Sequence, residues 1–136
     1  MDEQVKVLYQ KGCYIIDTIG YNRQLDFNPA IETAKSADII IFVGGISPRL
    51  EGEQLGVNVA GFNGGDRTDL ELPAVQTALL KELRKTGKPI ILVLMNGSAL
   101  SINWENENLN AIIEACVVFF GDLKISIRFH PIFYIT

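Results

Sequence analysis

Two carboxylates that stand two residues apart are the strongest candidates for chemistry in this sequence. They are Glu51 and Glu53, in the glycine-rich run EGEQLGVNVAGFNGGDRTDLELP that covers residues 51–73. A carboxylic acid whose pKa is raised by burial or by a like-charged neighbour can act as a general acid at neutral pH. The glycines would let the backbone approach a ligand closely. From the residues alone, an acid/base site and an ordinary solvated loop both remain open.

Further charged residues lie in the same run. Asp66 and Arg67 follow a Gly-Gly pair, where an acid beside a guanidinium more often braces a loop by charge-assisted hydrogen bonds than contacts substrate. We therefore expect these two residues to shape the loop. The spacing of Asp66, Asp69 and Glu71 does not match a calcium-binding EF-hand loop. We expect neither a metal site nor a cofactor.

Other residues that could carry chemistry have simpler interpretations. The Gly44-Gly45 pair follows an apolar run, but neither GxGxxG nor GxxxxGK[ST] is present, which weakens the case for nucleotide binding. His130 is the only histidine, has no nucleophile signature near it, and is expected to be structural. Cys13 and Cys116 lack metal-ligand spacing, so we expect both to be small buried side chains.

The elements that must position the 51–73 run follow from the hydrophobic pattern. Runs that are apolar at every position indicate strands covered on both faces, and a stripe with helical spacing indicates a surface helix. The pattern predicts strands at Val5–Tyr9, Asp38–Val43, Pro89–Met95, Ala111–Phe120 and Ser126–Thr136, a helix from Asn28-Pro29 to about Ala37, and a helix from Pro73 to Gly87 with an apolar stripe of Val75, Leu79, Leu80 and Leu83. Asn28 is expected to cap the first helix. Pro131, in the last strand, favours an edge position or a bend.

This order of elements predicts the fold class. Alternating strands and helices indicate an α/β fold with an open, mostly parallel sheet and helices on both faces, as in flavodoxin-like three-layer sandwiches. Such sheets bind ligands beyond the carboxyl ends of their strands. The loops of residues 44–73 and 96–104 both leave from those ends, so we expect them to share one rim. Trp104, in the second loop, could be a packing residue or a platform for a sugar ring.

Composition narrows the class of partner. The chain has 136 residues, which suits one domain, and it is 48% hydrophobic with a net charge of -4. Lysines and arginines are scattered, so no nucleic-acid surface is expected. No apolar run approaches the roughly 20 residues that span a bilayer. The first residues, MDEQVKV, have neither the basic nor the apolar region of a secretory signal, and the cellular location stays open.

Several separated motifs together resemble the C-terminal domain of glycoside hydrolase family 3, in its beta-glucosidase and beta-xylosidase branch. They are YQKGC, ADIIIFVGG, the 51–73 run with the helix PAVQTALLKEL, and GKPIILVLMNGSALSINW, in that order from about Val5 to Ala115. The resemblance implies an α/β sandwich that lies beside a catalytic barrel. In that family the barrel supplies an aspartate nucleophile and the sandwich supplies the acid/base glutamate. Carried over to this sequence, the acid/base role falls on Glu53, with Glu51 as the alternative register, and Asp66 and Arg67 match a loop-shaping motif.

The sequence departs from the family pattern in two places. The barrel is absent, so the resemblance implies that the isolated chain does not hydrolyse glycosides without a barrel-containing partner. After Ala115 about ten residues and one helix of the family pattern are missing, which abbreviates the C-terminal part of the fold. Loss of that helix should uncover apolar surface, and we expect self-association through the C-terminal strand region.

Two other functions remain open at this point. One is a non-catalytic carbohydrate-binding or interaction module that keeps the loop as part of a sugar subsite. The other is a flavodoxin-like binder of a small ligand or nucleotide, which only the generic fold favours.

Overall fold

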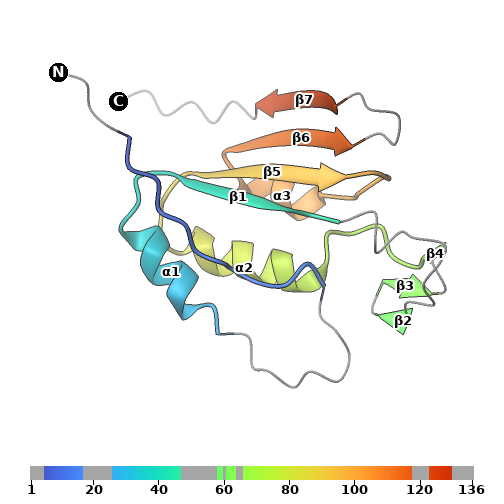
Figure 1. Ribbon diagram of the computed structural model, residues 1–136, viewed down its shortest axis with the longest axis horizontal. Coiled ribbons are helices and arrows are strands. Elements are labelled where there is room, and N and C mark those ends of the chain that lie inside the picture. Colours follow the sequence, from blue (N-terminus) through green and yellow to red (C-terminus); the bar gives the residue numbers. More distant parts are fainter. Residues whose placement is uncertain are drawn as a thin grey trace.

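The chain forms a four-stranded sheet with helices packed against it (Figure 1), as a computed structural model describes it. The structure describes residues 5–16, 26–46, 58–59, 61–63, 66–117 and 123–129. The strands of the main sheet are β1 (Ile40–Gly45), β5 (Ile90–Asn96), β6 (Ala111–Val117) and β7 (Leu123–Phe129), in the order β1-β5-β6-β7. The first three are parallel and β7 is antiparallel to β6. The expected α/β class, with an open and mostly parallel sheet, is confirmed.

The sequence pattern of α2 (Ala74–Arg84) explains how this helix packs. Its predicted stripe, Val75, Leu79, Leu80 and Leu83, is at most 5% exposed. Leu79, Leu80 and Leu83 share one core cluster with three residues that alternate along the buried face of β5, namely Ile90, Leu92 and Leu94. The helix ends before Gly87, whose φ of 75° lies in the left-handed region that glycine adopts without strain.

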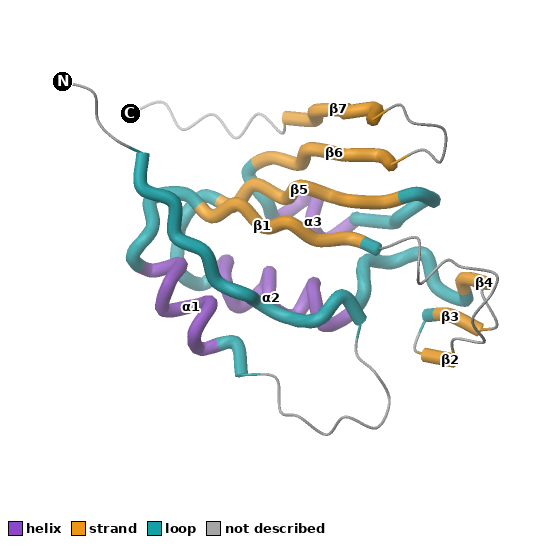
Figure 2. Tube along the Cα trace, in the orientation of Figure 1, coloured by secondary structure: helices purple, strands orange, loops and turns teal. Residues whose placement is uncertain are grey.

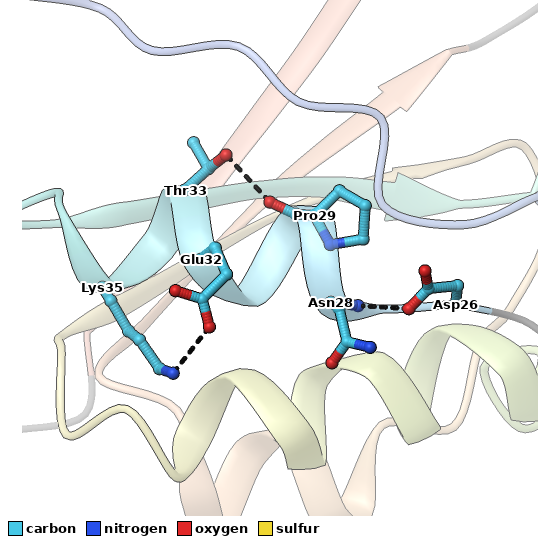
Figure 3. Close-up of polar contacts among 6 residues, drawn as sticks. All are labelled: Asp26, Asn28, Pro29, Glu32, Thr33 and Lys35. Carbon is cyan, nitrogen blue, oxygen red and sulfur yellow. Dashed lines mark hydrogen bonds and ion pairs between the residues drawn. The ribbon is translucent and has the colours of Figure 1, made fainter.

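The first helix, α1 (Asn28–Lys35), begins one residue earlier than its predicted cap implies. Asn28 is already helical, and the Asp26 carboxylate accepts a hydrogen bond from the Asn28 backbone N–H at 3.0 Å (Figure 3). The prediction that Asn28 caps the helix is therefore wrong, because Asp26 satisfies that amide from outside it. Pro29 lies in the first turn as expected, where its missing N–H costs no helical hydrogen bond. A surface ion pair joins Glu32 to Lys35 at 2.8 Å.

All three helices that the structure describes lie on one face of the sheet. The chain moves from β1 to β5 to β6 in one direction, and right-handed crossovers that keep one direction place their helices on one side. Accordingly α3 (Asn103–Asn108) packs beside α2, with Thr77 donating a hydrogen bond to Glu105 at 2.7 Å. On the opposite face, Ile41 and Val43 of β1 are each 66% exposed. Of the two faces expected to carry helices, the described helices cover one.

Two further predictions differ from the structure. Residues 5–9 form no strand, and the side chains of Val5, Val7 and Tyr9 are 84–90% exposed. Their alternating pattern favours a strand, but a strand needs a neighbour, and this run has none among the described residues. The last strand, β7, begins at Leu123 and not at Ser126, where the sequence predicts its start. It lies at the edge of the sheet. His130 and Pro131 lie outside the described residues.

No helix in the described part of the chain is both long enough and apolar enough to cross a membrane.

Candidate active-site rim

The two loops that leave the carboxyl ends of β1 and β5 meet, as the sequence predicts. The Ile46 backbone N–H donates to the Met95 carbonyl at 2.9 Å, directly after β1 ends. At the far end of the long loop, the Ser101 N–H donates to the Leu70 carbonyl at 2.7 Å, and Glu71 forms a parallel bridge with Ser101. The long loop thus begins and ends on one rim of the sheet (Figure 2).

A single buried amide fixes the point where β1 leads into this loop. Gln76 of α2 is only 2% exposed. Its Oε1 accepts a hydrogen bond from the Gly45 N–H at 2.7 Å, and its Nε2 donates to the Gly45 carbonyl at 2.7 Å. Nε2 also donates to the Ile15 carbonyl at 2.7 Å. The side-chain amide therefore forms hydrogen bonds with both the N–H and the C=O group of Gly45, as the backbone of a neighbouring strand would.

The Gly44-Gly45 pair leaves the space that this contact needs. A Cβ at Gly44 would lie 2.5 Å from the Gln76 Oε1 and 2.5 Å from the Phe42 ring. Gly45 has a φ of 123°, and a Cβ there would collide with the Met95 carbonyl oxygen. Both glycines are therefore required by close packing of the backbone. Backbone packing therefore explains the Gly44-Gly45 pair without a bound nucleotide.

Asn96 is a second buried amide on the rim, at the end of β5. Its Nδ2 donates to the Ser98 carbonyl at 3.1 Å and to the Glu114 carboxylate at 3.2 Å. Its Oδ1 is buried and has no hydrogen-bond donor among the described residues. The two acceptors around Nδ2 fix the orientation of this amide, since the reversed amide would point its oxygen at both of them.

The long loop carries a small antiparallel sheet of its own. Its strands are β2 (Asn58–Val59), β3 (Phe62–Asn63) and β4 (Asp66–Arg67), with Asn63 opposite Asp66 and Phe62 opposite Arg67. Gly61 turns the chain with a φ of 87° and accepts a hydrogen bond from the Thr68 N–H at 3.0 Å. The backbone of Asp66 and Arg67 thus lies within the folded part of the loop, while their side chains are outside the described structure.

The candidate catalytic residues themselves, Glu51 and Glu53, lie outside the described residues. The structure therefore defines the frame of the site, which is the start and end of the loop that carries them. Among the side chains described, no group of three or more His, Cys, Asp or Glu residues could hold a metal ion.

Trp104 and Cys13 have packing roles in the structure. Trp104 lies in α3, partly buried against the core, with the Lys81 Nζ 5.3 Å from the ring centroid. Cys13 is half-buried against the same core. Burial raises the pKa of the Cys13 thiol, and the nearby positive charge of Lys11 partly opposes this rise. The side chain of Cys116 is not among those described.

Sequence reasoning missed the roles of Gln76 and Asn96. A signal for Gln76 was present, because it falls within the buried stripe of α2 four residues before Leu80 and seven before Leu83. A polar side chain on such a stripe must find hydrogen-bond partners in the core. Asn96 stands before Gly97, and an Asn-Gly pair after an apolar run is typical of a turn, so the local sequence does not indicate a buried amide.

Fold and rim together define an α/β sandwich domain with a long loop at the carboxyl edge of its sheet. The family model described as "Glycosyl hydrolase family 3 C-terminal domain" matches residues 3–120. The chain belongs to this family. The sequence resemblance to glycoside hydrolases of the beta-xylosidase and beta-glucosidase type is thereby confirmed.

The relatives include proteins named as beta-xylosidases and beta-glucosidases. The chain is 46% identical over 91 residues to a xylan 1,4-beta-xylosidase of Xylanibacter ruminicola, covering 67% of this chain and 11% of the relative. It is 42% identical over 112 residues to a beta-xylosidase of Formosa agariphila, covering 82% and 14%. Among solved structures, a GH3 exo-beta-xylosidase (XlnD) in complex with a xylobiose aziridine activity-based probe aligns with a TM-score of 0.58 at 27% identity, over 76% of this chain and 12% of that one. The chain therefore spans about one-eighth of the length of the proteins it matches.

Proposed function

We propose that this domain contributes the acid/base carboxyl group to the hydrolysis of β-linked xylosides or glucosides. Glu53 is the proposed acid/base residue, and Glu51 is the alternative register. The observation that carries the proposal is the family match over residues 3–120, which includes the whole 51–73 loop. A retaining glycosidase uses two carboxyl groups about 5–5.5 Å apart, one as nucleophile and the other first as acid and then as base.

The frame of the loop supports this role. An acid/base group must be held within hydrogen-bond reach of the glycosidic oxygen. The Gly45–Gln76 contact fixes where the loop starts, and the Leu70–Ser101 hydrogen bond fixes where it returns to the sheet. A loop tied to a rigid sheet at both ends can hold a catalytic side chain against a neighbouring domain more precisely than a loop tied at one end.

The second carboxyl group requires a partner. In the proposed function the nucleophile comes from a barrel-containing partner, which also supplies most contacts to the sugar. The isolated chain is then inactive on glycosides, and carbohydrate binding needs both parts. Because the match covers only 11–14% of each relative, most of the length of those enzymes lies beyond this domain.

Complementation tests the proposal. The barrel domain of the Xylanibacter ruminicola relative, produced without its own sandwich domain, is mixed with this chain and assayed on an aryl β-xyloside and an aryl β-glucoside. We expect activity only in the mixture, and a fall of about 10²–10⁴-fold in Glu53→Gln, the range general acid catalysis contributes. Glu51→Gln is the matched control. Full activity with Glu53→Gln and loss of activity with Glu51→Gln would assign the acid/base role to Glu51. Activity unchanged by both substitutions would refute the proposal that this domain supplies the acid/base residue.

Self-association through the C-terminal strand region is also proposed. The position of β7 at the edge of the sheet supports it, since an edge strand can pair with another chain. A monomeric mass by light scattering at tens of micromolar would contradict it.

A further inference from the structure

Residues 12–15 form a short strap over the first turns of α2, and close contacts hold it there. A Cβ at Gly12 would lie 2.5 Å from the Leu79 side chain, so the chain passes directly over that leucine. Cys13 is half-buried against the core, and the Ile15 carbonyl accepts a hydrogen bond from Gln76 at 2.7 Å. Gln76 precedes Leu79 by three residues, so the strap runs along the helix in the opposite direction (Figure 1).

The last residues of the strap are held by their backbone. The side chains of Tyr14 and Ile15 are 51% and 48% exposed. The Ile15 carbonyl, in contrast, meets the amide nitrogen of Gln76, a residue that is only 2% exposed. At its end the strap therefore contributes a main-chain acceptor to the interior.

This carbonyl completes the hydrogen bonding of the Gln76 amide. An amide nitrogen carries two hydrogens. One is donated to the Gly45 carbonyl and the other to the Ile15 carbonyl, both at 2.7 Å, while Oε1 accepts from the Gly45 N–H. If Ile15 moves away, either one N–H loses its acceptor or the amide turns toward another acceptor and leaves Gly45. The three contacts therefore depend on one another.

Gly45 has no room to absorb a shift of this amide. Gln76 holds it on one side, and on the other side a Cβ at Gly45 would collide with the Met95 carbonyl oxygen. The next amide, that of Ile46, donates to the same carbonyl at 2.9 Å. The chain leaves β1 at Gly45 on its way to the 51–73 run. A displaced strap therefore changes the place at which that run begins.

We propose that the strap of residues 12–15 sets the start of the long loop through Gln76, which makes Gln76 a positioning residue for the acid/base group. This inference rests on the proposed function of the 51–73 run. A misplacement of about 1 Å can lower a reaction rate by about 10²-fold, so a side chain that touches no sugar can still matter to the reaction. The step affected is protonation of the leaving-group oxygen.

Hydrogen exchange in the isolated chain tests the link between strap and loop. Gly12→Ala and Gly12→Val place side chains of increasing size against Leu79. Because Leu79 is 0% exposed and belongs to the core cluster, the strap is expected to move outward. We expect the Gly45 amide to exchange about 2–10-fold faster, the factor that one net hydrogen bond contributes. The side-chain amide NMR signals of Gln76 report in the same samples whether its contact with Ile15 has loosened.

Two comparisons separate this effect from a general loss of stability. The Ile40 N–H donates to Pro89 at the other end of β1, so the exchange rate of Gly45 is expressed relative to that of Ile40. Gly87→Ala makes the same chemical change where a Cβ meets nothing within 4 Å, and it should leave this ratio unchanged. An unchanged ratio in Gly12→Val would overturn the proposal. Gln76 signals that do not shift in Gly12→Val would overturn it as well, because the strap would then not hold the amide.

Kinetics in the mixture with the barrel domain test the link to the chemistry. A dinitrophenyl β-xyloside has a leaving group that departs almost without protonation, whereas xylobiose needs the general acid. We expect the ratio of kcat/KM for xylobiose to kcat/KM for the dinitrophenyl xyloside to fall by at least about threefold in Gly12→Val, and by about 10²–10⁴-fold in Glu53→Gln, the full contribution of a general acid. Both substrates are assayed on one preparation, so an unfolded fraction cancels from the ratio.

The two variants separate this inference from the function on which it rests. An unchanged kinetic ratio in Gly12→Val beside a lowered ratio in Glu53→Gln would show that the strap does not position the acid, and it would leave the proposed function intact. An unchanged ratio in Glu53→Gln and in Glu51→Gln would refute the proposed function. The exchange ratio of Gly45 to Ile40 would then decide on the strap alone.

Discussion

Replacing Gln76 by leucine should destabilise the domain far more than its single lost amide suggests. The change leaves the Gly45 N–H and C=O groups without their partners in the buried end of β1. A buried main-chain group left unsatisfied costs about 1–3 kcal/mol, so the pair costs about 2–6 kcal/mol. The Ile15 carbonyl is left out of this sum because that end of the contact is only partly buried. Small domains are stable by about 5–15 kcal/mol in total, so the loss is a large fraction.

Equilibrium unfolding in urea measures this loss. With a slope of about 2 kcal/mol per molar urea, the unfolding midpoint should fall by about 1–3 M. Gln10→Leu makes the same chemical change at an exposed residue and should stay within about 0.5 kcal/mol of the wild type. If Gln76→Leu also stays within that margin, Gln76 does not hold the end of β1 as described.

Gln76→Glu separates the acceptor role from the donor role. The glutamate can still accept from the Gly45 N–H, but when ionised it cannot donate to the carbonyls of Gly45 and Ile15. We expect strong destabilisation at pH 7 that is partly relieved near pH 4, where a protonated carboxyl group recovers one donor. Equal destabilisation at both pH values would argue against the donor role.

Further predictions concern two glycines, a buried hydrogen bond and the Cys13 thiol. Gly45→Ala should prevent normal folding because its Cβ meets the Met95 carbonyl, whereas Gly87→Ala, with open space around it, should cost only about 1 kcal/mol in urea unfolding; similar costs would contradict the packing at Gly45. Thr77→Val should cost about 1–3 kcal/mol, because it removes the hydrogen bond to the Glu105 carboxylate, which is 3% exposed; a neutral effect would show that water replaces the hydroxyl. Because burial raises the pKa of Cys13 in the folded chain, the thiol contributes stability below its unfolded pKa, and this stability is lost as pH rises through the folded pKa. In a Cys116→Ser chain, iodoacetamide at pH 8 should therefore react more slowly with the folded protein than with the urea-unfolded one, and equal rates would contradict the shift.

Periodicity was sufficient to predict the elements that make the core. The stripe of α2 was predicted from its 3.6-residue repeat, and β5 was predicted from its run of consecutive apolar residues. That run suggested a strand buried on both faces, whereas in the structure full burial alternates along β5 and marks the face that meets α2. The short helix α3, NWENEN, was missed because its sequence is polar and carries no periodic stripe. Residues 5–9 were predicted as a strand because their pattern fits one. A strand forms only where a neighbouring strand is available to pair with it, and the local sequence does not reveal whether one is.

Part of the candidate site could be predicted from the sequence, and part could not. The meeting of the two loops follows from parallel topology, so the sequence could predict it. The amide contact between Gln76 and Gly45 could not be predicted, because it joins residues 31 positions apart through side-chain geometry. Within the described residues, the frame of the loop depends on contacts of this kind.

The same amide contact has a consequence for how the sheet can grow. Because the side chain of Gln76 already fills the hydrogen-bonding positions at Gly45, a strand arriving beside β1 meets a physical stop at that residue. It cannot slide toward the loop, so only the stretch before Gly45 is available for pairing. Uncharged edge strands are ordinarily prone to register slippage. Here a helix side chain sets the limit of the register and keeps the carboxyl end of β1, where the long loop begins, clear of other strands.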